Sequence, residues 1–396
     1  SEGEYVYLSA TSSNDACIST ADIVCARFYN ASADTGGSDD YTGLFTANTF
    51  DVTCPDVNFG GSCQLNLSTG TWFCDGSFDL SGITLANITE STSTIEMTAN
   101  ATSIVGSSSG AIQIFNITFK TGVSLTYNED IRSGGSVIIE VGASLTIANT
   151  QVWSESPYFS TGPNTVDGTL HINPGISLRD KCGWTFGASS TLSGNSLENR
   201  ANVVTTHDFI VTAGATISIT TIRLTFEQNK SYTVTPFIST SNVTYAGTVS
   251  TPTIIFAAGT GAYADLTFET NDDASFDCSN NPDIGISGDF TIDAFTTGSY
   301  TKGTGTFTFN GSGTQTITTN GSDIENVDVD KSAGVCTQLD DMTCTSLTVS
   351  GAAGATFGPN TFDIYTGDVT LSSGIISSGI GSVWNINGNF DSSTLD

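Results

Sequence analysis

Short segments that alternate apolar and polar residues, each opened by a glycine, recur through most of this chain. Residues 122–127 (GVSLTY), 142–147 (GASLTI) and 214–219 (GATISI) share this form. A period of two places one face of a strand against a core and the other in solvent. Strands this short, with turns this frequent, are typical of a β-sandwich or of the rungs of a solenoid. We find no convincing 3.6-residue periodicity that would indicate a helix.

Self-similarity favours the solenoid. Residues 288–292 (GDFTI) return as 367–371 (GDVTL), and residues 303–311 return in looser form as 379–388, about 78 residues later. A unit of that length would hold several turns of roughly 20 to 30 residues each. The sequence therefore predicts an all-β chain, a parallel β-solenoid (β-helix), whose second copy is incomplete at residue 396.

Three regions of the sequence differ in cysteine content and in repeat pattern. Residues 1–78 carry five of the nine cysteines and a polar loop-like stretch, which predicts a small Cys-rich N-terminal cap or head. Residues 79–286 are expected to form irregular β-solenoid rungs. Residues 287–396 are expected to form the repeated solenoid units, with the period of about 78 residues.

The net charge of the chain and its first residue bear on its partners and its cellular location. The net charge is -30 with only 10 Lys and Arg, which argues against nucleic-acid binding because phosphate contacts need clustered cations. No apolar run approaches a membrane span, so membrane insertion is not expected. The chain begins with Ser1 rather than Met, and we interpret it as a mature secreted or cell-surface protein.

The cysteines suggest local disulfides. No CxxC pair occurs and there are only two histidines, so a zinc site is not expected. Pairs close in sequence, Cys17 with Cys25 and Cys336 with Cys344, are the natural partners, and an odd count leaves one thiol free or bonded to another subunit. The disulfide candidates are Cys17, Cys25, Cys54, Cys63, Cys74, Cys336 and Cys344.

No cofactor is indicated, and calcium is the one ion that the sequence would suit. Carboxylates supply the hard oxygen ligands that calcium prefers, although no EF-hand or calcium-binding nonapeptide occurs. Asn-x-Ser/Thr triplets permit glycosylation, but Ser and Thr are so abundant that the triplets do not indicate it. The calcium candidates are Asp34, Asp39, Asp40, Asp272 and Asp273, and the triplets start at Asn30, Asn66, Asn87, Asn100, Asn116, Asn229, Asn242, Asn310 and Asn320.

Residues 303–318 (GTGTFTFNGSGTQTIT), followed by 346–349 (SLTV) and 367–371, resemble a repeat common in very large secreted bacterial and archaeal surface proteins. Those proteins are usually described as β-solenoid adhesins or as filament or sheath components. The similarity is good over 287–396, stylistic over 79–286 and absent over 1–78. The resemblance implies cell-surface placement and repeated architecture, and it carries no active site.

These observations favour a structural role without catalysis. The hypothesis is a subunit of an extracellular filament, sheath or surface layer, with copies of itself as partners joined head to tail. An open solenoid end is an unpaired strand edge, to which an extended segment of a neighbour can add. The candidate assembly residues are Glu4, Tyr5, Val6, Tyr7 and Leu8 at one end, and Phe390 and Leu395 at the other.

Two alternatives stay open. A carbohydrate-binding adhesin or fibre module would bind glycans on its lateral face, where Trp153 is the better surface candidate. A β-helix enzyme that degrades polysaccharides would need clustered carboxylates, and Asp328 and Asp330 would share one strand face. Flat Thr arrays raise ice binding as a third option, but the Thr-x-Thr pattern does not recur at every rung.

Overall fold

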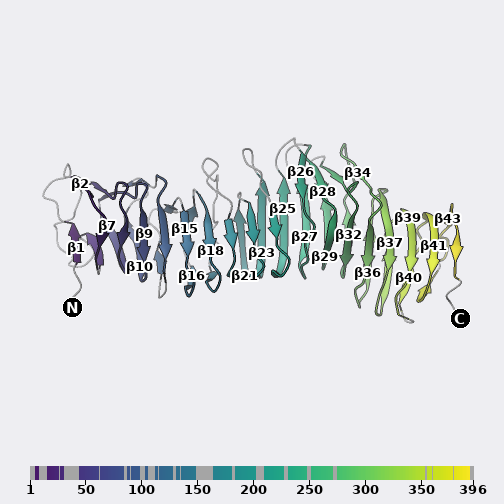
Figure 1. Cartoon of the computed structure of the whole chain (residues 1–396). Helices are drawn as coiled ribbons and strands as arrows, with labels where there is room; N and C mark the ends of the chain where they lie inside the picture. The colour runs from purple at the N-terminus through teal and green to yellow at the C-terminus, as the bar shows by residue number, and fades with distance from the viewer. Residues whose placement is uncertain are drawn as a thin grey trace. The chain divides into compact units, whose positions relative to one another are not determined.

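The computed structural model shows an all-β fold in which parallel strands stack into a β-solenoid (Figure 1). The chain divides into two compact units, one of residues 1–197 with 211–216 and one of residues 198–210 with 217–396. No α-helix occurs among the described residues. Those are residues 5–8, 16–25, 27–30, 44–61, 63–83, 87–89, 91–98, 103–105, 112–114, 116–127, 131–133, 135–148, 164–180, 183–201, 209–226, 231–247, 251–270, 274–352, 355–358, 360–377 and 379–392.

In the first unit the described strands pair in parallel with strands one turn away in the chain. One sheet runs β1-β4-β7-β10-β13, a second β2-β5-β8-β11, and a third from β3 through β6, β9, β12, β15, β18 and β20 to β22. The strands are β1 Tyr5–Leu8, β2 Ala16–Ile18, β3 Ile23–Val24, β4 Arg27–Asn30, β5 Leu44–Thr46, β6 Val52–Thr53, β7 Asp56–Gly61, β8 Gln64–Asn66, β9 Thr71–Cys74, β10 Ser77–Ile83, β11 Ile88–Thr89, β12 Thr94–Met97, β13 Ser103–Val105, β14 Ile112–Ile114, β15 Asn116–Phe119, β16 Ser124–Tyr127, β17 Ile131–Ser133, β18 Val137–Ile139, β19 Ser144–Ile147, β20 Asn164–Val166, β21 Thr169–Asp180 and β22 Trp184–Phe186.

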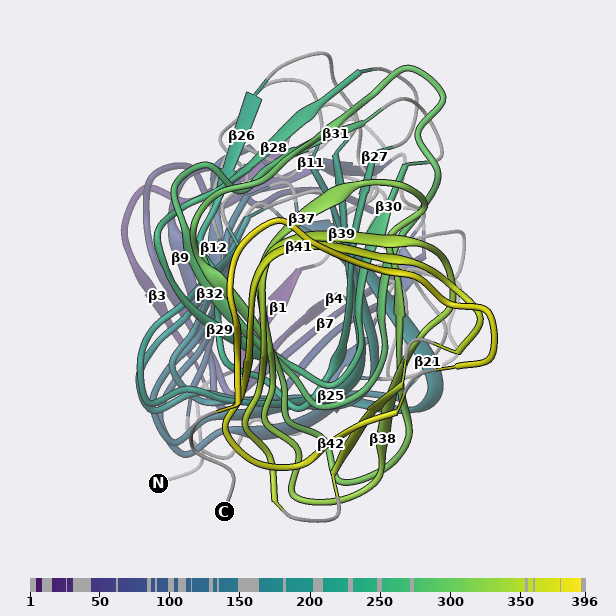
Figure 2. The same cartoon turned by 90° about the vertical axis from the view of Figure 1, so that its right-hand side faces the viewer.

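The strands of the second unit pair in the same parallel pattern. One sheet contains β27-β30-β33-β36-β38-β40-β42 and another β29-β32-β35-β37-β39-β41-β43, and Figure 2 shows β37, β39 and β41 lying over one another. At the border of the units lie β23 Thr191–Ala201, β24 Phe209–Val211 and β25 Thr216–Phe226. The others are β26 Ser231–Val234, β27 Asn242–Gly247, β28 Thr253–Phe256, β29 Gly259–Tyr263, β30 Leu266–Glu269, β31 Ser275–Asp277, β32 Pro282–Ile286, β33 Phe290–Ile292, β34 Tyr300–Thr301, β35 Thr306–Phe309, β36 Gln315–Thr318, β37 Asp323–Val329, β38 Val335–Gln338, β39 Met342–Val349, β40 Thr356–Gly358, β41 Ile364–Leu371, β42 Ile375–Ile376, β43 Trp384–Ile386 and β44 Phe390–Asp391.

The predicted solenoid is therefore confirmed, and its rungs begin inside the region expected to form a cap. β1 pairs with β4, and β4 with β7, in parallel and in register, so the described residues of 1–78 are themselves rungs. Cys25, Cys54, Cys63 and Cys74 occupy inward positions as small apolar residues would. That is why a Cys-rich stretch continues the coil.

The core is a column of apolar side chains that face inward from every rung. Trp72 is fully buried, and the rings of Phe28, Phe45, Phe59 and Phe78 surround it at centroid distances of 5.9 to 6.4 Å. These rings come from three successive turns of the first unit. Each rung therefore buries its neighbours, as the alternation in the sequence predicts.

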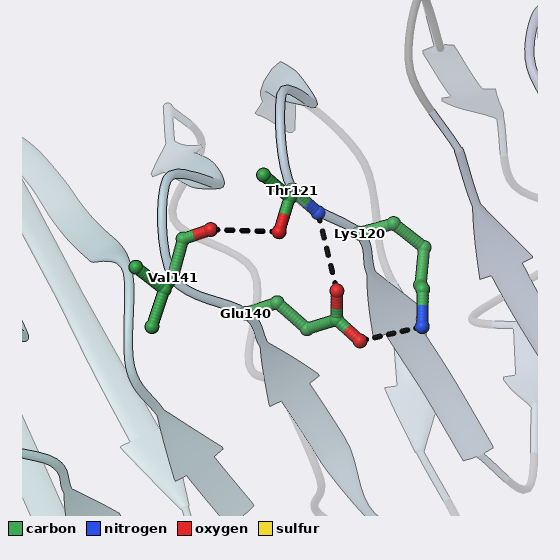
Figure 3. Close-up of polar contacts among 4 residues, drawn as sticks. All are labelled: Lys120, Thr121, Glu140 and Val141. Atoms are coloured by element: carbon green, nitrogen blue, oxygen red, sulfur yellow. Dashed lines mark hydrogen bonds and ion pairs between the residues drawn. The ribbon is translucent and has the colours of Figure 1, made fainter.

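Stacked β-turns form one corner of the coil. In the turns at 120–123 and 140–143 the amide of the fourth residue donates to the carbonyl of the first, and Gly142 has a φ of 78°. Figure 3 shows how the two turns join: Lys120 Nζ pairs with Glu140 Oε1 at 2.5 Å, while the Thr121 amide donates to Glu140 Oε2 at 3.2 Å. The Lys120 hydrogen bond lowers the pKa of Glu140, although both side chains are partly exposed and the pair is screened by solvent.

At other corners of the coil, an aspartate side chain lies next to a glycine of the following rung. Asp265 Oδ1 accepts a hydrogen bond from the Asp289 amide one rung later, and a Cβ on Gly288 would lie 2.0 Å from that oxygen. Asp368 Oδ1 accepts from the Asn389 amide in the same way, and a Cβ on Gly388 would lie 2.1 Å from it. Only glycine leaves room for the carboxylate, which ties each aspartate to a glycine one turn away.

Asp289 and Asp368 occupy the same place in residues 288–292 and 367–371, and each accepts a hydrogen bond from an amide one rung later, which explains part of the similarity. β33 and β41, which carry these two copies, belong to different sheets, so the copies share a corner motif and not a position around the coil. The hydrogen bonds from an amide to an aspartate of the preceding rung join residues 20 to 29 apart. Carboxylates that accept from the amide of the next rung are Asp22, Asp51, Asp56, Asp265, Asp283, Asp289, Asp341, Asp363 and Asp368.

Candidate assembly site

The last rung of the described residues, defined here as residues 375–391 with β42, β43 and β44, has partner strands on one side only among the described strands. β42 pairs with β40, while β43 and β44 both pair with β41. In register, Trp384 lies over Ile364, and Phe390 lies over Val369, so the last rung covers the buried residues of the rung before it. The other edge of these strands carries backbone N–H and C=O groups that have no partner strand among the described residues.

Apolar side chains of the last rung are uncovered. Ile380 is 97% exposed, Phe390 55% and Val383 52%. Trp384 packs edge-on against the buried ring of Phe357 at 6.2 Å, but it is only half-buried. From residue 371 onward none of the described side chains is fully buried. Among the described residues, a strand edge without a partner strand and an apolar surface thus coincide, a combination that is typical of interaction surfaces.

At the other end, the segment expected to add to a neighbour is already a strand of its own chain. Tyr5, Val6, Tyr7 and Leu8 form β1, which pairs with β4 in parallel and ends its sheet. This segment therefore offers its outer edge and is not a free donor strand. β2 and β3 likewise pair on one side only. Glu4 and Leu395 lie outside the described residues.

The predicted Cys336–Cys344 disulfide is wrong. Both residues are free thiols, buried in β38 and β39, which belong to different sheets. Residues close in sequence occupy successive sides of one rung, whereas residues a full turn apart come together. Burial raises the pKa of Cys336 to about 12 and that of Cys344 to about 11, so both thiols are protonated at neutral pH. Cys63 is a free, buried thiol too, and the side chain of Cys17 lies outside the described residues.

The calcium candidates and the surface tryptophan cannot be placed. Asp34, Asp39, Asp40, Asp272, Asp273 and Trp153 all lie outside the described residues. Elsewhere, within the described ranges, no group of three His, Cys, Asp or Glu side chains has the arrangement of a metal site. Of the predicted carboxylate pair, Asp328 accepts a hydrogen bond from Ser350 Oγ at 2.7 Å, and burial raises its pKa.

The glycosylation triplets differ in their surroundings. Asn242 and Asn310 are exposed. The amide nitrogen of Asn320 donates to the Ile292 carbonyl at 2.7 Å, and that of Asn116 donates to Thr94 Oγ1 at 3.4 Å, so the atom that would carry a glycan is engaged at both. Asn66 and Asn87 are half-buried, whereas Asn100, Asn229 and the side chain of Asn30 are not described.

A buried carboxyl group inside the second unit was not anticipated from the sequence. Glu325 is fully buried in β37, where Tyr300 Oη donates to its Oε2 at 2.5 Å and the Gly303 amide donates to its Oε1 at 2.9 Å. Burial raises the pKa of Glu325 above its ordinary 4.5, because a charged carboxylate loses its hydration there. A second buried ionisable residue is Lys331, whose Nζ donates to Gln315 Oε1 at 2.6 Å and to the Gly311 carbonyl at 2.8 Å.

Replacing Glu325 with Gln is expected to flatten the pH dependence of stability. The unfolded carboxyl titrates near 4.5 and the native one at higher pH, so within that window the native state binds more protons. The free energy of unfolding of the wild type therefore falls as pH rises from about 4.5 toward neutrality. Thermal midpoints of wild type and Glu325→Gln between about pH 4 and 8 measure this. Equal slopes for the two proteins would contradict the burial of an ionisable group at this position.

Within the described ranges no helix is long and apolar enough to cross a membrane. Comparison of the chain with protein-family models, with curated proteins and with solved structures gives no match.

Proposed function

We propose that this chain is a structural subunit that assembles end to end, with the last rung of one copy receiving the first rung of the next. The assembly would be an extracellular filament, sheath or surface layer. The observation that carries the proposal is the last rung itself, where a one-sided strand edge coincides with the exposed side chains of Ile380, Val383 and Phe390.

The other end supports the same arrangement. β1, β2 and β3 each have one paired edge and one outward edge. Every strand pair described in the coil is parallel, so a second copy that adds in the same direction would continue the ladder of hydrogen bonds. A contact between two different surfaces of one molecule does not close on itself, and it generates a fibre. The acidic composition and the resemblance to surface-protein repeats support an extracellular setting.

The test is the association state of the purified chain across a concentration series. We expect the weight-average mass by analytical ultracentrifugation to rise with concentration, and electron microscopy to show linear particles. Since each copy carries a net charge of -30, added salt should strengthen association by screening the repulsion between copies.

A matched pair of variants locates the contact. In Val383→Lys/Phe390→Lys, two cations enter the last rung, and lysine on a strand edge blocks pairing. The control Val141→Lys/Ile238→Lys makes the same change at exposed apolar residues elsewhere. We expect the first variant to weaken association by about tenfold or more and the control to leave it unchanged. A wild type that stays monomeric at all concentrations and salt levels, or equal effects of both variants, would refute the proposal.

A further inference from the structure

Three cysteines form a column inside the first unit. Val24 lies beside Thr53 in register, and Thr53 beside Phe73, so Cys25, Cys54 and Cys74 follow one another on successive rungs. The backbone confirms this, because the Cys25 amide donates to the Thr53 carbonyl at 3.0 Å and the Cys54 amide to the Phe73 carbonyl at 2.9 Å. All three side chains face inward.

The first two thiols lie on neighbouring rungs. Cys54 Sγ donates a hydrogen bond to the Asp56 carbonyl at 2.8 Å. A hydrogen bond with Cys25, followed by burial, raises the pKa of the Cys54 thiol. Neighbouring parallel strands lie about 4.8 Å apart, which falls inside the range of about 4.4 to 6.8 Å that a disulfide needs between Cα atoms. The backbone therefore has no need to move for the two sulfurs to join.

A surface pocket of about 560 Å³ reaches this pair. Cys25 and Cys54 line it together with Val24, Phe73 and Asp75, whereas Cys74 is absent from its lining. Cys25 is 7% exposed and Cys54 1%, so a small reagent in the pocket meets Cys25 first. The exposure of Cys25 to the pocket and its position next to Cys54 thus single out the Cys25–Cys54 pair among the three cysteines.

We propose that Cys25 and Cys54 are a redox modification site, which a small-molecule disulfide such as glutathione disulfide oxidises to an inter-rung disulfide. The Cys25 thiolate attacks one sulfur of glutathione disulfide, which breaks the S–S bond, forms a mixed disulfide and releases one glutathione thiolate. The Cys54 thiolate then attacks the Cys25 sulfur, which forms the Cys25–Cys54 bond and releases the second glutathione. The two protons lost by the cysteines pass to the two glutathione thiolates, so the protein is oxidised by two electrons and the glutathione disulfide is reduced.

Peptide mapping tests the proposal on the intact chain. The folded protein is treated with glutathione disulfide, its remaining thiols are alkylated under denaturing conditions, and it is cleaved before aspartates. Cleavage at Asp15, Asp22, Asp51 and Asp56 places Cys17, Cys25 and Cys54 in separate fragments, 15–21, 22–33 and 51–55. Cys63 and Cys74 share the fragment 56–74. We expect one cross-linked product, 22–33 joined to 51–55, in most of the chains, and its loss after reduction.

Two serine variants complete the design. Cys74→Ser should keep the cross-link between fragments 22–33 and 51–55, whereas Cys54→Ser should lose it and retain glutathione on Cys25 as a mixed disulfide. Retention of that adduct shows that Cys54→Ser still presents Cys25 in a folded pocket, and a far-ultraviolet circular dichroism spectrum checks the fold independently. A cross-link from Cys25 to Cys17 or to fragment 56–74, or full alkylation of Cys25 and Cys54 after oxidation, would overturn the proposal.

Discussion

Replacing Trp72 with alanine is expected to destabilise the first unit by about 4 kcal/mol. The indole is fully buried among the rings of Phe28, Phe45, Phe59 and Phe78, and it donates to the Leu67 carbonyl at 3.4 Å. Alanine removes the transfer free energy of the ring and leaves a cavity that rungs held in register cannot collapse to fill. Denaturant unfolding followed by the fluorescence of the remaining tryptophans and by circular dichroism measures the loss.

The neighbouring residue provides the control. Phe73 lies on the outward face of the same strand, β9, and it is only half-buried. Phe73→Ala removes a side chain of the same class one position away, and we expect it to cost about 1 kcal/mol or less. Equal losses for the two variants would mean that the inward and outward faces of β9 are assigned incorrectly.

Replacing Gly305 with alanine is expected to cost about 3 kcal/mol, the upper end of the usual range for overpacking. A Cβ at this position would lie 2.0 Å from the carbonyl oxygen of Pro282 and 2.8 Å from its carbonyl carbon. These are backbone atoms of the preceding rung and cannot rotate away. The rung must therefore separate from its neighbour, which also strains the hydrogen bond from the Asn326 amide to the Gly305 carbonyl, 3.2 Å long.

Gly313→Ala is the matched control, because a Cβ at Gly313 would have no atom within 4 Å. The same methyl group is added to the same unit, and we expect a change of about 0.5 kcal/mol or less. Hydrogen exchange locates the effect, since contacts in a solenoid run only between neighbouring rungs and faster exchange should stay close to β32, β35 and β37. If the Gly305 variant melts with the wild type, the close approach of these two rungs is refuted.

Much of the fold could be predicted from the sequence, because period-two alternation and glycine turns are local signals. Residues 142–147 form a corner and then a strand with alternating burial, as their pattern predicts. The partner of each strand is a different matter. It depends on how many residues complete a turn, and the similarity about 78 residues apart does not give that number, because its two copies lie on different sheets.

The candidate site was predictable only in part. Phe390 stood out because an alternating pattern reached the last residues without a residue that blunts an edge. The prediction of a Cys336–Cys344 disulfide failed because these two residues, although near in sequence, lie in different sheets. Glu325 directly follows the inward-facing Ile324, so alternation assigns it to the outside, and no local signal indicates its burial.

The corner aspartates have a consequence for how the coil can be built. Asp265 accepts from the amide of Asp289, and the carboxylate of Asp289 accepts in turn from the amide of Thr316. A completed turn that carries such an aspartate thus offers an acceptor positioned for the turn that follows it in the chain. Because a ribosome releases the N-terminus first, an earlier turn can serve as the template for the later one. Folding of the coil then has a preferred direction, from the N-terminal turns to the C-terminal turns. Nucleation at an early turn suffices for the later turns to fold one after another.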